Sequence, residues 1–244
     1  MDNEIPAIEE RRAYSVLRDD LLLTRTSYMA LSALGYSRLS ILCTEQPDLM
    51  NGYDRDMQPK LALRAKNAGA LSKAEEALRV SGIPFVTVEH GGQAVGIFLP
   101  PMPRSALPKE VANLQLFSER RHAVDEEETP VAVGEDDRQT CPIIFRSSLE
   151  APLGKMIAQV GHAAWGAGIR SPSGVRILVL GIGDQDVQEA RQAGGWQAIV
   201  DAGRTVFGEP TLTCAWGGYI PEPVETVTLE TSVVLNTPLQ EPKP

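Results

Sequence analysis

The chain is poor in aromatic residues and in cysteine. Of its 244 residues, 5% are Phe, Trp or Tyr, so a core must rest mainly on Ala, Val, Ile and Leu. A hydrophobic content of 43% is enough for a globular core. Cys43, Cys141 and Cys214 stand far apart and form no CxxC pair. This odd, sparse set argues against a disulfide framework or structural zinc, and it favours a reducing cytosol.

Long apolar runs are also missing. No stretch approaches the roughly 20 apolar residues that a membrane helix needs. The first residues, Met1-Asp2-Asn3-Glu4, lack the basic start and apolar core of a signal peptide. We therefore expect a cytoplasmic protein without a membrane partner.

Basic charge is in deficit, because 23 Lys and Arg stand against 32 Asp and Glu, for a net charge of −9. This total argues at first against a nucleic-acid partner. The acidity is not evenly spread, however: residues 119–139 carry −5 and residues 221–244 carry −3, whereas 140–220 are neutral and 1–118 carry −1. The charge therefore leaves room for contact with RNA in the second half.

The distribution of charge and proline divides the chain into four parts. Residues 119–139 hold two acidic runs and few large apolar side chains, which is typical of a solvated linker. The last residues contain three prolines that oppose regular structure. We expect an α/β domain over 1–118, an acidic linker over 119–139, a second domain over 140–220, and an acidic, Pro-containing tail over 221–244.

The two domains show the same order of predicted elements, β-α-β-α-β-β. Strands that alternate with helices indicate an α/β sheet with helices on its faces. In the first half, Ser72 and Glu75 predict a capping box that opens a helix ending at Val80. In the second, Asp184 or Asp186 could cap a helix that ends before Gly194-Gly195. We interpret the chain as a diverged tandem repeat, although two α/β segments could also look alike by chance.

One helix of the second half carries an unusual polar stripe. Lys155, Gln159 and His162 stand at i, i+4 and i+7, which places them on nearly one face. Taken alone, this pattern favours the solvent-exposed side of a partly exposed helix. A second signal, Asp201-Ala-Gly-Arg-Thr205, follows a predicted strand, where α/β sheets place binding residues. That segment could also be a turn with a structural Asp201–Arg204 bridge.

Together, these blocks resemble the second type of peptidyl-tRNA hydrolase, which is archaeal and eukaryotic and also scattered in bacteria. The matching blocks are Arg146-x-x-Leu149, Gly154-Lys155-x-x-x-Gln159-x-x-His162-Ala163, Asp201-Ala-Gly-Arg-Thr205 and Thr211-x-Thr213. The resemblance covers roughly 140–220. It implies an enzyme that cleaves the ester between a peptide and the 3′ ribose of tRNA, on a small α/β domain with a mixed sheet. It also implies a cytosolic protein that needs no metal or other cofactor and that often forms dimers.

Carried onto this sequence, the resemblance implies an active site of Lys155, Gln159, Asp201 and Thr205. His162, Arg204 and Thr213 would contact the substrate. Such a site suits ester hydrolysis, which needs a positioned water and donors for the developing oxyanion. No Ser-His-Asp arrangement is evident, and the general base stays unassigned.

The sequence departs from the family pattern at several points. Ser148 stands where the family usually has Asp, and an acidic Glu209 follows the Asp-Ala-Gly-Arg-Thr block. The helix that bears Lys155 is expected to be short, because Gly166 and Gly168 follow closely. Two alternatives therefore stay open: an esterase, amidase or acyl-transfer enzyme on a non-tRNA substrate, and a non-catalytic binding or regulatory protein.

The first half lacks residues that match this candidate active site. Aligned on Arg18, the positions of Lys155, Gln159 and His162 are taken by Ser27, Leu31 and Leu34, and those of Asp201 and Thr205 by Glu89 and Gln93. We expect a degenerate, non-catalytic copy of the same fold. It would pack against the second half as an internal pseudo-dimer, and a further homodimer is possible.

Overall fold

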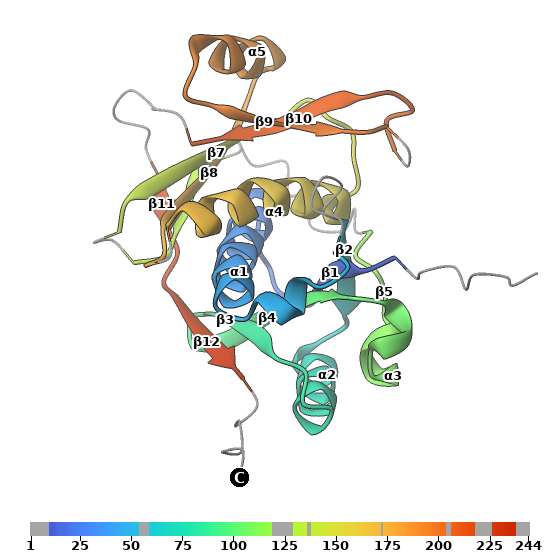
Figure 1. Cartoon of the computed structure of the whole chain (residues 1–244). Coiled ribbons are helices and arrows are strands. Elements are labelled where there is room, and N and C mark those ends of the chain that lie inside the picture. Colours follow the sequence, from blue (N-terminus) through green and yellow to red (C-terminus); the bar gives the residue numbers. More distant parts are fainter. Residues whose placement is uncertain are drawn as a thin grey trace, which may run out of the picture.

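The computed structural model contains two mixed β-sheets with helices between and outside them (Figure 1). It describes residues 10–53, 59–118, 129–135, 138–171, 173–203, 206–217 and 226–237. The expectation of a mixed α/β architecture is confirmed.

Over its described residues, the first half contributes five strands and three α-helices, with two short 3-10 turns at Pro47–Met50 and Arg104–Ala106. Its elements are β1 (Arg12–Arg18), α1 (Arg25–Glu45), β2 (Lys60–Ala65), α2 (Ala68–Val80), β3 (Phe85–His90), β4 (Gln93–Met102), α3 (Lys109–Ala112) and β5 (Gln115–Leu116). The first sheet has the order β12-β3-β4-β1-β2-β5. One of its two edge strands, β12 (Thr231–Asn236), therefore lies far from the others in the sequence.

The second half contributes the remaining elements. They are β6 (Val131–Val133), β7 (Thr140–Arg146), α4 (Leu153–Arg170), β8 (Arg176–Ile182), α5 (Asp184–Ala193), β9 (Gln197–Asp201), β10 (Thr211–Trp216), β11 (Val227–Thr228) and β12 (Thr231–Asn236). The second sheet has the order β11-β6-β8-β7-β10-β9.

The two halves share one topology. In the first half, β1 pairs with β2 in parallel, and β4 runs antiparallel to its neighbours β1 and β3. In the second half, β7 pairs with β8 in parallel, and β10 runs antiparallel to its neighbours β7 and β9. The first strand and the first helix even keep a constant offset of 128 positions, from 12 to 140 and from 25 to 153. The predicted β-α-β-α-β-β order is therefore confirmed in both halves.

The halves pack around a common core. Helices α1 and α4 lie side by side between the two sheets, α2 and α3 cover the outer face of the first sheet, and α5 covers that of the second (Figure 1). The largest apolar cluster contains α1, α4 and the inner faces of both sheets. This cluster draws on residues of both halves, so the two halves share one core.

Small residues bring α1 and α4 close together. A Cβ on Gly168 would lie 2.3 Å from the backbone oxygen of Ser37, and one on Gly161 would lie 2.5 Å from the buried ring of Tyr36. The expectation of a short helix is wrong, because α4 runs 18 residues through these glycines. Their helix-weakening tendency is outweighed by the close packing that they permit.

The predicted helix caps differ from those observed. Helix α2 begins at Ala68, and its N-cap is Asn67, whose side chain accepts a hydrogen bond from the Ala70 amide at 2.9 Å. The capping box at Ser72 is therefore wrong. Asp184 is the first residue of α5 rather than its cap, which is Gly183. Asp184 is engaged elsewhere, by Arg146.

The acidic segment and the tail contain strands that the sequence did not predict. Within 119–139, Val131–Val133 forms β6, which is fully buried between β8 and β11. Within 221–244, β12 pairs with β3 along six residues. The linker and tail expectations are corrected only for the described residues of these segments, where Val131–Val133 and Thr231–Asn236 extend the sheets beyond the strands of the repeats. The acidic run 125–128 and residues 238–244 lie outside the described residues.

Candidate functional site

Two residues of the polar stripe of α4, Lys155 and Gln159, face strands β9 and β10 of the second sheet. Lys155 lies in the first turn of α4 and Gln159 one turn later. Asp201 is the last residue of β9, and Thr213 lies on the neighbouring strand β10. The structure thus brings together four predicted residues from three separate blocks of the sequence.

Asp201 is the centre of this cluster. Its Oδ2 forms an ion pair with Lys155 Nζ and accepts a hydrogen bond from Gln159 Nε2 at 2.8 Å. Its Oδ1 accepts a hydrogen bond from the Gly203 amide at 2.9 Å. Asp201 is 8% exposed, so this nearly buried carboxylate is contacted by one cation and two hydrogen-bond donors.

Thr213, on strand β10, is the fourth residue of the cluster. Its hydroxyl lies 3.0 Å from Gln159 Oε1 and 3.1 Å from the backbone oxygen of Ile199. Both Gln159 and Thr213 are buried, at 4% and 0% exposure. The amide of Gln159 is therefore oriented, with its nitrogen toward Asp201 and its oxygen toward Thr213. Thr213, a weaker candidate from the sequence, has a positioning place in the site.

The turn after Asp201 requires glycine. Gly203 has φ +75°, and a Cβ there would lie 2.3 Å from the backbone of Glu209. The loop returns past Phe207, whose ring centroid lies 6.0 Å from Lys155 Nζ. Arg204 and Thr205, both predicted at the site, lie outside the described residues.

His162 faces the first half of the chain rather than Asp201. Its Nδ1 lies 3.3 Å from Nζ of Lys60, the first residue of β2. Burial lowers the pKa of His162 well below its usual value, and the nearby charges of Lys60 and Lys155 lower it further. The sequence does not point to Lys60, because a lysine at the start of a strand carries no signal toward a helix residue 102 positions away.

Arg18, which precedes α1, and Arg146, which precedes α4, pair with carboxylates from different places in the two repeats. Arg146 donates to Asp184 at 2.6 and 2.9 Å, and Ser148 also contacts Asp184. These hydrogen bonds lower the pKa of Asp184 to about 2. Asp184 therefore supplies the carboxylate that the family pattern led us to expect at position 148.

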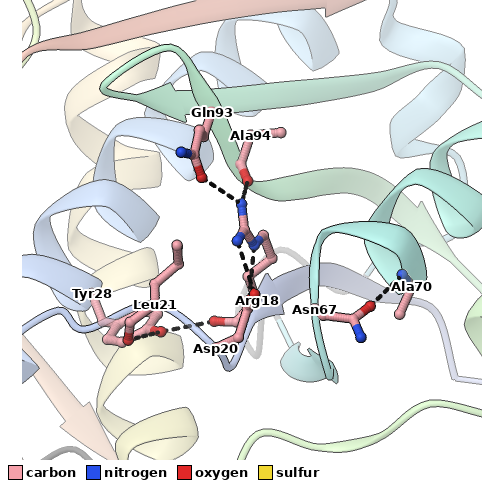
Figure 2. A network of polar contacts seen from close by, with 8 residues as sticks. All are labelled: Arg18, Asp20, Leu21, Tyr28, Asn67, Ala70, Gln93 and Ala94. Atoms are coloured by element: carbon pink, nitrogen blue, oxygen red, sulfur yellow. Dashed lines mark hydrogen bonds and ion pairs between the residues drawn. The ribbon is translucent and has the colours of Figure 1, made fainter.

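In the first repeat the carboxylate comes from the adjacent Asp20. Arg18 donates to it with both Nε and Nη2 at 2.9 Å, and to the backbone oxygen of Ala94 at 3.2 Å (Figure 2). Arg146 makes the equivalent backbone contact to Leu212 at 3.3 Å. The two arginines thus occupy matching positions of the two repeats.

The positions of the first repeat that match the polar stripe are part of the core. Leu31 and Leu34 are each 1% exposed, and Ser27 is 6% exposed. The strand register places His90 opposite Gln93, as Asp201 stands opposite Thr211. His90, rather than Glu89, is therefore the counterpart of Asp201, which corrects the sequence alignment by one residue. Its Nδ1 lies 2.9 Å from the backbone oxygen of Glu230.

Two other basic residues of the second half, Arg170 and Arg176, make contacts with Trp216 and Thr228 rather than with Asp201. Arg170 ends α4, about 22 Å along the helix at 1.5 Å per residue, and its guanidinium stacks on Trp216 at 4.8 Å. Arg176 donates to Thr228 at 3.2 Å. In the described part of the chain, Lys155 is thus the cation at the Asp201 end of the site.

Within the described residues, no group of three or more His, Cys, Asp or Glu side chains is placed to hold a metal ion. Over the same residues, no helix is both long and apolar enough to cross a membrane.

Comparison of the chain with protein-family models and with curated proteins gives no match.

The buried Lys60 predicts a pH-dependent stability. Burial lowers its pKa to about 7, whereas an unfolded lysine has a pKa near 10.4. Between these values the unfolded chain binds more protons, so the Lys60 contribution to the free energy of unfolding rises with pH. Burial also raises the pKa of Cys43 and Cys214 to about 12. Above about pH 8.5 the unfolded thiols lose protons that the folded thiols keep, so the cysteine contribution to the free energy of unfolding falls with pH. We therefore expect urea midpoints of wild type and Lys60→Met, measured from pH 7 to 9, to diverge, with the wild type gaining more. Parallel curves would contradict this.

Proposed function

We propose that the chain hydrolyses the ester bond of peptidyl-tRNA, or of a related N-blocked aminoacyl-tRNA, at the Lys155–Asp201 site. The observation that carries the proposal is the network Lys155–Asp201–Gln159–Thr213. It assembles the separate sequence blocks that resemble the second type of peptidyl-tRNA hydrolase.

In the proposed reaction, a water oxygen attacks the ester carbonyl carbon and the bond to the ribose 3′ oxygen breaks. The ribose oxygen leaves with a proton, and the peptide leaves as a carboxylic acid. Asp201 holds Lys155 at the site, and the remaining N–H groups of Lys155 are donors for the oxyanion or for a phosphate. The general base is left unassigned. The reaction as proposed uses no cofactor, takes place in the cytoplasm, and has the tRNA 3′ end as its partner.

A second candidate is an esterase or amidase that acts on a non-tRNA substrate at the same site. Two observations favour it: Asp201 neutralises the charge of Lys155, and Arg170 lies at the far end of α4. RNA affinity depends strongly on the number of cations that contact phosphates. A non-catalytic regulatory role is the third possibility.

The decisive assay offers purified protein an N-acetyl-aminoacyl-tRNA and measures release of free tRNA at low and moderate salt. Release that exceeds spontaneous hydrolysis and that falls with rising salt supports the proposal. Turnover of p-nitrophenyl esters without turnover or binding of the tRNA would support the second candidate. Neither activity, together with no tRNA shift in a gel at low salt, would rule out both enzymes.

A further inference from the structure

The first repeat reaches the candidate site through one buried side chain. Lys60 is 8% exposed, and its Nζ lies 5.0 Å from the ring centroid of Trp165 and 5.9 Å from that of Tyr36. It comes within 3.3 Å of His162 Nδ1, on the helix that also carries Lys155 and Gln159. A lysine from one repeat is therefore packed against the polar stripe of the other.

This contact determines which imidazole nitrogen of His162 carries the proton while Lys60 is charged. A lysine ammonium has three donors and no acceptor, so His162 Nδ1 must be the acceptor when Lys60 is charged. A neutral imidazole that accepts at Nδ1 carries its proton on Nε2. Lys60 from β2 and Lys155 from α4 both disfavour the imidazolium form, while Tyr36 from α1 contributes a ring beside Lys60.

The corresponding positions of the other repeat hold apolar residues. By the strand registers, Lys60 pairs with Ala13 and Ile177 with Cys141, and these pairs occupy equivalent places in the two sheets. His162 corresponds to Leu34 in the same way. Leu34 and Ile177 both belong to the apolar core, at 1% and 0% exposure. The polar pair Lys60–His162, with one residue from each repeat, thus has apolar residues, Ile177 and Leu34, at both corresponding positions.

We propose that Lys60 is a positioning residue that holds His162 as a neutral Nε2–H donor beside Lys155. The ligand class is an oxygen of the RNA 3′ end, either a phosphodiester oxygen or a ribose hydroxyl; this assignment of the ligand rests on the proposed function. The second repeat is consequently not an autonomous enzyme, because its site includes a residue of the first.

The test begins with the imidazole itself. The chain has only three histidines, so the ring of His162 can be assigned by NMR with a His162→Gln variant. At pH 6.5 we expect long-range ¹H–¹⁵N spectra of the wild type to show His162 as the neutral Nε2–H tautomer. In Lys60→Met the apolar packing is kept and the donor is lost, so the ring should sample both tautomers and titrate closer to pH 6.5. Lys60→Arg should restore the wild-type tautomer, and Lys66→Met, at an exposed position just after β2, should change nothing.

Activity gives the second readout. In Lys60→Met we expect kcat/KM for N-acetyl-aminoacyl-tRNA to fall about tenfold, as for one lost hydrogen bond, with an added loss on the acid side where His162 becomes protonated. A His162 ring with the same tautomer and titration in wild type and Lys60→Met overturns the inference. A changed ring in a protein that does not turn over tRNA supports the role of Lys60 and refutes the proposed substrate.

Discussion

Lys155→Met is expected to lower kcat/KM for N-acetyl-aminoacyl-tRNA hydrolysis by about 10²- to 10³-fold. This is the usual cost of removing one donor to a developing oxyanion. The lysine is the cation that Asp201 holds at the site. Steady-state release of tRNA is the measurement, with Lys73→Met as the matched control, because Lys73 is exposed on α2.

The stability of this variant must be separated from its activity. Removing Lys155 leaves Asp201 nearly buried without its cation, which destabilises the fold. The double variant Lys155→Met/Asp201→Asn removes both charges, so it should recover much of the stability and none of the activity. Because the two residues act as a unit, their effects on catalysis should not add. Activity of Lys155→Met within threefold of wild type would contradict the assigned site.

Gly168→Ala is expected to destabilise the chain by about 3 kcal/mol or more, through overpacking between α1 and α4. The new Cβ would lie 2.3 Å from the Ser37 carbonyl oxygen, an atom of the opposing backbone that cannot rotate away. The two helices must then separate, and the core that they share with both sheets would open. Urea unfolding followed by circular dichroism gives the free energy difference.

Gly69→Ala is the matched control for this prediction. Gly69 is also a helical glycine, in the first turn of α2, and its Cβ would meet nothing closer than 3.5 Å. Alanine should therefore be neutral there or stabilise the chain by about 0.5–1 kcal/mol, through its helix propensity and the reduced entropy of the unfolded state. Equal effects at the two positions would refute the packing argument.

Much of the local structure could be predicted from the sequence. The buried strand that ends in Arg146, the presence of an Ala-rich helix after it and the repeated element order all follow from short-range periodicity. The errors lie where local patterns compete. Gly166 and Gly168 indicated a short helix because glycine weakens isolated helices, whereas tight contact with α1 reverses that preference. Ser72 was expected as a cap, but Asn67 lies five residues earlier and takes that place.

The site was predictable in its members and not in its arrangement. Lys155, Gln159 and Asp201 could be named from spacing and resemblance. The sequence does not indicate that Thr213 orients Gln159, or that Asp184 takes the carboxylate place beside Arg146. Those contacts join residues 38 to 54 positions apart, and their geometry depends on how helix and sheet pack.

The sequence by itself determined which elements form and which side chains are available for chemistry, because hydrophobic periodicity and turn residues act within a few positions. Only the tertiary structure decided that the two repeats share one core, that β6 and β12 come from the acidic segments to complete the sheets, and that Lys60 meets His162. The physical reason is the same in each case. Each of these contacts joins segments far apart in the sequence, so it leaves no pattern in either segment alone.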